Sequence, residues 1–178
     1  WKIGGTPRPE SLTVIGDVRP TAIGVNGQVL SGQHDVRKWP DGTVSVHDNG
    51  TIANRPPFVV RYQIDTAERT ATVVEEFSDP RVSASICCGS ARRLAGGHWL
   101  VQWGASPFLT ELDAEGNPVL TIQYNMGDTF SYRAVPILPG TVSASTLRSG
   151  MDAVARSGFS TSAVEKPAIR RPASIDDL

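Results

Sequence analysis

Residues 31–51, SGQHDVRKWPDGTVSVHDNGT, place several side chains that could do chemistry within one short stretch. His34 precedes Asp35, and Asp48 precedes Asn49. A carboxylate beside an imidazole can fix the tautomer of the ring, which suits the ring to act as a base or a nucleophile. A His-Asp pair alone is more often structural, and Asp-Asn-Gly also ends strands, because Asn and Gly tolerate left-handed backbone. Both readings stay open on these residues alone.

A turn separates the two polar pairs. Pro40-Asp41-Gly42 is a turn signal, so residues 34–39 and 43–49 are predicted to pair as antiparallel strands. Counting back from the turn places His34 opposite Asp48, within one residue. The next loop begins at the same end and carries Arg55. We therefore expect five polar residues to converge at one mouth of the sheet: His34, Asp35, Asp48, Asn49 and Arg55.

The other two histidines have plainer expected roles. His47 lies within the strand-like run TVSVHD and is expected to pack between neighbouring sheets. His98 follows Gly96-Gly97 and is expected at a turn or a strand edge. The three histidines share no metal-ligand spacing, so no metal site is predicted.

The middle of the chain repeats itself. The segment HDVRKWPDGTVSVHDNG (34–50) aligns with GSARRLAGGHWLVQWGA (89–105) at a shift of 55 residues. Each copy is followed by two short runs rich in β-branched or aromatic residues and bounded by Gly, Pro, Asn or Asp. These runs are 57–65, 70–77, 108–113 and 118–124. Four antiparallel strands repeated at roughly 45 to 55 residues are typical of a propeller blade.

The predicted fold is therefore all-β, a fragment of a β-propeller with antiparallel four-stranded blades. The blades are expected at residues 31–80 and 84–127, with flanking strands at 1–5 and 130–138, so that the partial propeller spans residues 1–140. A two-sheet sandwich built from the same strands remains the alternative.

The second copy differs from the first in the size of its side chains. The same counting sets Gly89-Ser90 facing Gly104-Ala105-Ser106. Bulky polar groups on one blade beside small residues on the next would leave a recess, as ligand pockets often do.

Three arginines fall at the same phase of the candidate inner strands: Arg37, Arg92 and Arg133. Because inner strands line the channel of a propeller, these guanidinium groups could bind an anionic substrate. The alternative is that they pair with Asp35, Asp48 or Glu111 inside the blades.

The end of the chain has another character. SASTLRSGMDAVARSG is predicted to form one short helix, and the following residues have the Pro, Ser and charge content of a disordered tail. Residues 141–178 are therefore assigned to a helix and a disordered tail.

The bulk composition excludes some classes of function. A formal net charge of −1 gives no field that would steer the chain to nucleic acid, and no apolar run reaches the roughly 18 residues of a membrane span. The adjacent Cys87 and Cys88 are expected to be reduced, because a disulfide between neighbours needs a strained peptide. The chain begins at Trp1 without a leader, so we expect an export signal to be absent or already removed, and the first strand to be truncated.

Taken together, five segments in this order resemble the arylsulfotransferase-type β-propeller family. The segments are SGQHDVRKWPDGTVSVHDNG, TATVVEEF, GSARRLAGGHWLVQWG, TELDAEGNPVL and FSYRAVP, within residues 31 to 136. The resemblance implies a six-bladed propeller that is exported to the periplasm or the cell exterior, of which this chain holds about two blades.

The resemblance also implies an activity. Family members move a sulfuryl group from a phenolic sulfate ester to another phenol, without phosphoadenosyl phosphosulfate or another cofactor, through a histidine in the channel. His34 matches the histidine of the family's Gln-His motif, and Arg55 is a match for the arginine after the Asp-Asn-Gly segment.

This chain departs from the family pattern at two positions. Val36 stands where active members have an asparagine, and Gly89 stands opposite His34, so a second channel histidine is not evident. Two rival hypotheses follow: a non-catalytic propeller that binds a ligand or a protein, and an incomplete fragment with no function of its own.

Overall fold

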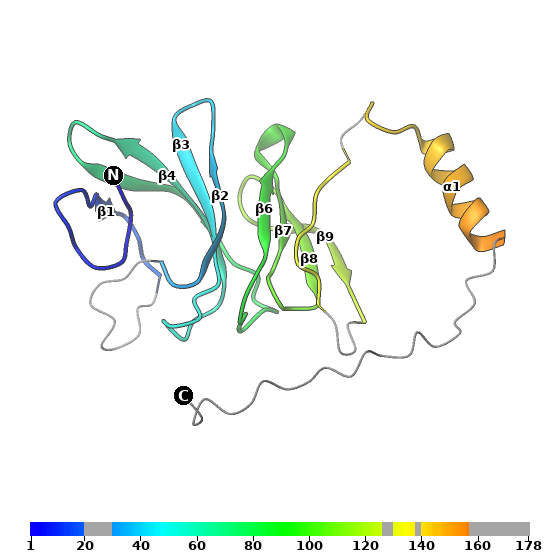
Figure 1. Ribbon diagram of the computed structural model, residues 1–178, viewed down its shortest axis with the longest axis horizontal. Helices are drawn as coiled ribbons and strands as arrows, with labels where there is room; N and C mark the ends of the chain where they lie inside the picture. The colour runs from blue at the N-terminus through cyan, green and yellow to red at the C-terminus, as the bar shows by residue number, and fades with distance from the viewer. Residues whose placement is uncertain (20–29, 126–129, 138–139, 157–178) are drawn as a thin grey trace, which may run out of the picture. The chain divides into compact units, whose positions relative to one another are not determined.

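A computed structural model describes residues 1–19, 30–125, 130–137 and 140–156 of the chain (Figure 1). The chain divides into two compact units, Trp1–Pro136 and Ile137–Leu178. The first unit holds two β-sheets and the second holds one helix.

The first sheet has five strands in the order β1-β5-β4-β3-β2. Four of them form a consecutive antiparallel series, and β1 pairs parallel with β5 at the far edge. The strands are β1 Thr13–Ile15, β2 Gln33–Lys38, β3 Thr43–Asp48, β4 Phe58–Asp65 and β5 Thr70–Phe77.

The hairpin between β2 and β3 forms where the turn signal predicts it. Gly42 adopts φ 82° and donates its N–H to the Trp39 carbonyl at 3.0 Å, which closes the turn. The register pairs Gln33 with Asp48 and His34 with His47, so the predicted position of His34 is confirmed within one residue.

A bulge interrupts β2 after His34. The register shifts between His34 and Arg37, and Asp35 within this step adopts a left-handed φ of 51°. Asp is among the residues that tolerate this conformation best. The bulge breaks the simple alternation of faces along β2, which sequence counting assumes.

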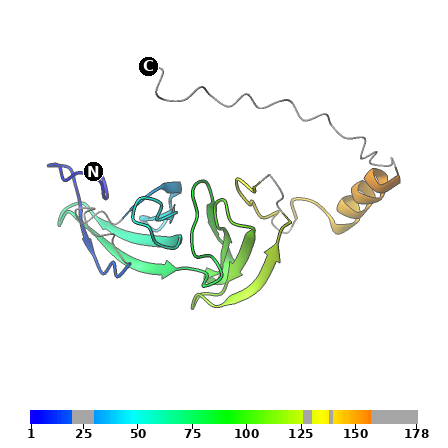
Figure 2. The ribbon, with the colours of Figure 1, turned by 90° about the horizontal axis from the view of Figure 1, so that it is seen from below.

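The second sheet has four strands in chain order, all antiparallel, as the repeat predicts. A short 3₁₀ turn, η1 Ala95–Gly97, lies between its first two strands. The strands are β6 Ser90–Arg93, β7 Trp99–Gln102, β8 Phe108–Leu112 and β9 Pro118–Gln123. Figure 2 shows the two sheets from below, each as its own twisted set of strands.

One hydrophobic cluster joins the two sheets. Trp99, Val101 and Leu112 of the second sheet pack with Val59 of the first, and the ring of Trp39 meets that of Trp99 edge-on at 6.0 Å between centroids. The opposite face of the first sheet carries a second cluster around Val46, Val60 and Tyr62. Since β3 lies between the two clusters, all six of its residues are buried.

Two predicted flanking strands are wrong. In residues 1–5, Gly4 and Gly5 both have left-handed φ values, which a strand does not accommodate, and Lys2 makes only an isolated bridge to Ser11. The strand at this end of the first sheet is instead β1, which is too short to show a periodic pattern.

Residues 130–137 form no strand either, although they run beside the start of β6. The Gly89 N–H donates to the Tyr132 carbonyl at 3.1 Å, and the Ser90 hydroxyl exchanges hydrogen bonds with the backbone of Ala134. The side-chain hydroxyl of Ser90 therefore takes the place of the backbone groups that would bond with Ala134 in a regular strand pair. Residue 138 lies outside the described residues.

The predicted helix is confirmed as α1, Ala144–Arg156. The Ser143 hydroxyl accepts the N–H of Thr146 at 3.0 Å, which caps the first turn. Among the described residues, no helix is long and apolar enough to cross a membrane. The tail predicted to be disordered, after about residue 158, lies outside the described residues.

Candidate functional site

His34 meets the second sheet through the backbone of Cys88. The Cys88 N–H donates to Nε2 of His34 at 3.2 Å, and the side-chain amide of Asn49 donates to the Cys88 carbonyl at 2.9 Å. Because an amide N–H can only donate, Nε2 of His34 carries the lone pair and the proton of the ring lies on Nδ1. One residue of the second sheet thus connects two predicted site residues of the first.

Cys88 makes these two contacts in an unusual conformation. Its φ is 68°, in the left-handed region, and Gly89 follows with φ 96°. Non-glycine residues seldom adopt this region, and they keep it only where surrounding contacts hold them there. The contacts of Cys88 with His34 and Asn49 are the ones that do so here.

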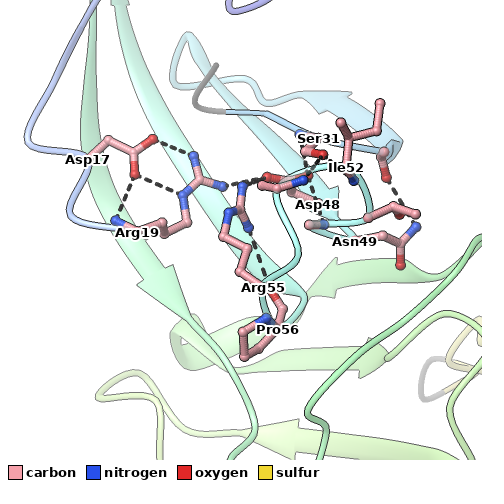
Figure 3. Close-up of polar contacts among 12 residues, drawn as sticks. Asp17, Arg19, Ser31, Asp48, Asn49, Ile52, Arg55 and Pro56 are labelled. Carbon is pink, nitrogen blue, oxygen red and sulfur yellow. Dashed lines mark hydrogen bonds and ion pairs between the residues drawn. The ribbon is translucent and has the colours of Figure 1, made fainter. Parts of the chain in front are cut away.

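Asp48 belongs to a different cluster, which Figure 3 shows. Its Oδ1 accepts the N–H of Ser31 at 2.8 Å and that of Gly50 at 3.3 Å. Its Oδ2 accepts from the guanidinium groups of both Arg19, at 2.9 Å, and Arg55. The Asp48 carboxylate is therefore used by two arginines and two backbone amides, and its described hydrogen bonds do not include the His34 ring.

Arg55 lies deep in the first sheet. Its side chain is 2% exposed, forms the ion pair with Asp48, and stacks over the Phe58 ring at 5.6 Å from the centroid. Arg55 and His34 come from the same end of the sheet, as predicted, but the guanidinium group of Arg55 turns into the protein to meet Asp48.

Arg19 completes the Asp48 cluster and was not predicted from the sequence. It also bonds with Asp17 and donates to the hydroxyl of Tyr62 at 2.7 Å. Burial alone would lower the pKa of Arg19, but the bonds and charges of Asp17, Tyr62 and Asp48 raise it above its ordinary value. No motif marks this arginine, because its partners are spread over three strands and a loop.

The three predicted anion-binding arginines differ in their described contacts. Arg37 and Arg92 both form ion pairs with Asp35, whose side chain is 3% exposed. Burial, and then the positive charge of Arg133, lower the pKa of Arg92. The expected alternative, pairing with Asp35, is therefore confirmed for Arg37 and Arg92, whereas Arg133 lies over the ring of Tyr132 at 5.1 Å from its centroid.

Asp35 also fastens the two sheets together. Its Oδ2 accepts the backbone N–H of Ala91, in β6, at 3.0 Å. His34 and Asp35 therefore run along the segment from Cys88 to Ala91, and Arg37 and Arg92 pair with Asp35 beside this line of contact.

His47 packs between the sheets, as predicted. It is fully buried, and its ring lies 6.1 Å from that of Trp103. Burial, and then the electrostatic interaction with His34 across the hairpin, lower the pKa of His47 to about 3. Neither ring nitrogen has a hydrogen-bond partner among the described residues.

The recess predicted from the small residues of the second copy is filled. A Cβ added to Gly89 would lie 2.7 Å from Nδ1 of His47, and one added to Gly104 would meet Ser85 and Asn49. The register also differs slightly, because Ser90 pairs with Gln102. The glycines therefore allow side chains of the first sheet to approach the second closely.

His98 precedes β7 and contacts Glu111 through Nδ1 at 2.9 Å, at the strand edge where it was predicted. Within the described ranges, no group of three or more His, Cys, Asp or Glu side chains could hold a metal ion.

Comparison with known families decides the relationship. The profile of a family described as Arylsulfotransferase (ASST) matches residues 21–125, which is more than half of the chain. The chain belongs to the arylsulfotransferase family. The match includes the β2–β3 hairpin with His34, Asp48 and Asn49, and all four strands of the second sheet. A search of curated proteins gives no significant match.

Membership in this arylsulfotransferase family supports a sulfotransferase-like function. Arg37, Arg92 and their shared partner Asp35 lie within the matched region.

Proposed function

We propose that this chain forms part of a β-propeller arylsulfotransferase in which His34 carries the sulfuryl group. Residues 31–80 and 84–127 would be two adjacent blades of six, and residues 1–140 the propeller part of the chain. Each of the two sheets has consecutive antiparallel strands, and a shared hydrophobic cluster lies between them, which supports this arrangement.

The observation that carries the proposal is the pair of arginines held at Asp35, the residue next to His34. Arg37 and Arg92 share this one carboxylate among the described ion pairs. The lowered pKa of Arg92 shows that burial and Arg133 disfavour its charge. A sulfate ester would add negative charge at this point and relieve the repulsion between the guanidinium groups.

The transfer would take place in two steps. Nε2 of His34 attacks sulfur, an N–S bond forms, and the S–O bond to the donor's aromatic ring breaks, so that a phenolate leaves. The acceptor phenol then attacks sulfur, the N–S bond breaks, and Nε2 regains its lone pair. The acceptor phenol loses one proton and the departing phenolate gains one, so the overall reaction is balanced in protons. No cofactor is needed.

The tautomer of His34 suits the first step. With its proton on Nδ1, the ring presents the lone pair of Nε2, which the Cys88 N–H holds in place before substrate arrives. The transition state of sulfuryl transfer is loose and anionic, so positioned cations contribute most of its stabilisation. Arg37, Arg92 and Arg133 would have this role.

Asn49, Asp48 and Arg55 would act through other groups. Asn49 holds the Cys88 carbonyl, and with it the peptide that meets His34. Asp48 and Arg55 hold the loop after β3, from which Asn49 projects. We assign these three residues a positioning role, and assign contact with the substrate to His34 and the three arginines.

The experiment is phenol release from an aryl sulfate, with a second phenol as acceptor, using the full-length protein. His34→Ala should lower transfer by a factor of roughly a hundred or more, as loss of a nucleophile commonly does. His98→Ala is the matched control, because its only described polar contact is with Glu111, and it should retain transfer. Normal transfer by a folded His34→Ala protein would contradict the assignment.

A second candidate is a propeller that binds an aryl sulfate without turnover. Two observations favour it: Nε2 of His34 is already occupied by the Cys88 amide, and Val36 stands where the family pattern has an asparagine. Calorimetric binding of an aryl sulfate that Arg92→Ala abolishes, together with no phenol release by the wild type, would select this candidate. In either case the family resemblance implies export to the periplasm or the cell exterior.

A further inference from the structure

Two adjacent cysteines lie in the segment that enters β6. Both are free thiols, Cys87 is half-buried, and Cys88 is 7% exposed. The two thiols interact with each other, and burial, followed by this interaction, raises the pKa of Cys88 to about 11. Cys87 is therefore the more accessible thiol, and Cys88 lies next to it on the protected side.

The backbone of this dipeptide carries contacts to both sheets. The Cys87 carbonyl accepts the N–H of Ala105 at 3.0 Å and the hydroxyl of Ser85 at 3.2 Å. The N–H of the same peptide unit, which belongs to Cys88, donates to His34. One peptide plane thus joins the His34 ring to the loop after β7, and the plane cannot rotate without losing both sets of contacts.

We propose that Cys87 and Cys88 are a redox modification site, and that formation of a disulfide between them detaches the Cys88 amide from His34. Neighbouring Cα atoms are about 3.8 Å apart across a trans peptide, whereas disulfides usually join Cα atoms about 4.4 to 6.8 Å apart. Closure of this eight-membered ring therefore forces the intervening peptide and the φ of Cys88 away from their present geometry. The peptide that must move is the one that bonds with His34.

The oxidant is a small disulfide, for example oxidised glutathione. The Cys87 thiolate attacks one sulfur of the oxidant, an S–S bond forms, and one glutathione thiolate leaves and takes up a proton. The Cys88 thiol then loses its proton and attacks the Cys87 sulfur, which expels the second glutathione. Two electrons and two protons pass from the protein thiols to the oxidant. Since the pKa of Cys88 is raised, the second step should be the slower one near neutral pH.

The inference does not depend on sulfuryl transfer, because both of its measurements are physical. Oxidation of the full chain should lower its mass by about 2 Da, which is the loss of two hydrogens. No glutathione should remain attached to the oxidised protein. In nitrogen-15 NMR spectra of the imidazole rings, Nε2 of His34 should shift on oxidation and return on reduction, while the ring signals of His98 stay unchanged.

Two variants complete the experiment. Cys87→Ser and Cys88→Ser each leave one thiol, so neither should show the 2 Da loss, and the His34 signals of Cys87→Ser should not respond to the oxidant. If Cys88→Ser does not fold, Cys87→Ser alone provides the comparison, because its side chain is half-exposed.

Any of four results would overturn the inference, and the first three concern the oxidised product. They are a glutathione adduct that persists in the folded wild type, a disulfide between two chains on a non-reducing gel, and a 2 Da loss that leaves the His34 signals in place. A folded protein that resists oxidation, while the urea-unfolded chain is oxidised, would overturn it as well.

Discussion

The backbone amide of Cys88 donates to Nε2 of His34 at 3.2 Å, although the two residues are 54 positions apart in the chain. This contact joins β2, an edge strand of the first sheet, to the segment that enters the second sheet. It also fixes the tautomer of the ring, so the histidine that matches the family motif owes its orientation to the neighbouring sheet.

The contact of Asn49 with Cys88 should be needed to keep this geometry. Asn49→Ala removes the side-chain donor to the carbonyls of Cys88 and Gly32. The Gly32 carbonyl keeps its bond from the backbone N–H of residue 49, whereas the Cys88 carbonyl loses this donor in a buried place. We expect a loss of about 2 kcal/mol in the free energy of unfolding, and a shifted NMR signal of the His34 ring. Urea denaturation measures the first effect. Asn117→Ala, at an exposed turn, should cost less than about 0.5 kcal/mol, and an equal loss for the two variants would contradict the assignment.

Gly89 should be intolerant of any side chain. Gly89→Ala places a Cβ against the buried ring of His47 and also forces alanine to φ 96°, so it should cost about 3 kcal/mol or more in unfolding free energy. Gly42→Ala separates the two causes. Gly42 has φ 82° and open space around its Cβ position, so that variant should lose only about 1 to 2 kcal/mol. Similar losses at the two positions would show that the contact with His47 is unimportant.

Folding stability should fall on acidification because of His47. Its pKa is lowered to about 3 in the folded chain, from an ordinary value of 6.5. Between these values the unfolded chain binds a proton that the folded chain does not, so stability present above pH 6.5 is lost as the pH falls toward 3. One pKa unit corresponds to about 1.4 kcal/mol, so urea denaturation at pH 5 should show a loss of about 2 kcal/mol from this residue relative to pH 7.

The matched variant for the pH experiment is His47→Gln, which is neutral throughout this range. Its stability should be lower at pH 7, but it should depend less steeply on pH between 7 and 5 than that of the wild type. Equal slopes would mean that another group controls the acid sensitivity.

Neutralising Asp48 should be among the costly single substitutions. Asp48→Asn leaves the buried guanidinium groups of Arg19 and Arg55 without their shared carboxylate, so we expect a loss of about 3 to 5 kcal/mol, measured by urea denaturation. Glu115→Gln removes one negative charge from an exposed turn and should change stability by less than about 0.5 kcal/mol. A loss below about 1 kcal/mol for Asp48→Asn would show that the two arginines find other partners.

The sequence by itself determined the local elements. The turn signal at Pro40-Asp41-Gly42 set the β2–β3 hairpin and placed His34 within one residue of its observed partner, because a tight turn fixes the register of the strands that it joins. The internal repeat predicted the four strands of the second sheet, and the residues of the segment 143–158 predicted the helix α1. In each case the deciding contacts lie within a few residues of each other along the chain.

The tertiary structure alone decided which groups the site residues meet. The partner of His34 is a backbone amide, which every residue except proline has and which no side-chain pattern can mark. Arg19 reaches Asp48 from 29 positions away, and hairpin counting does not predict this partner. The space beside the glycines that suggested a recess is instead occupied by the side chains of His47 and Asn49. How closely two sheets approach depends on packing across their whole interface, which the sequence of a single strand does not determine.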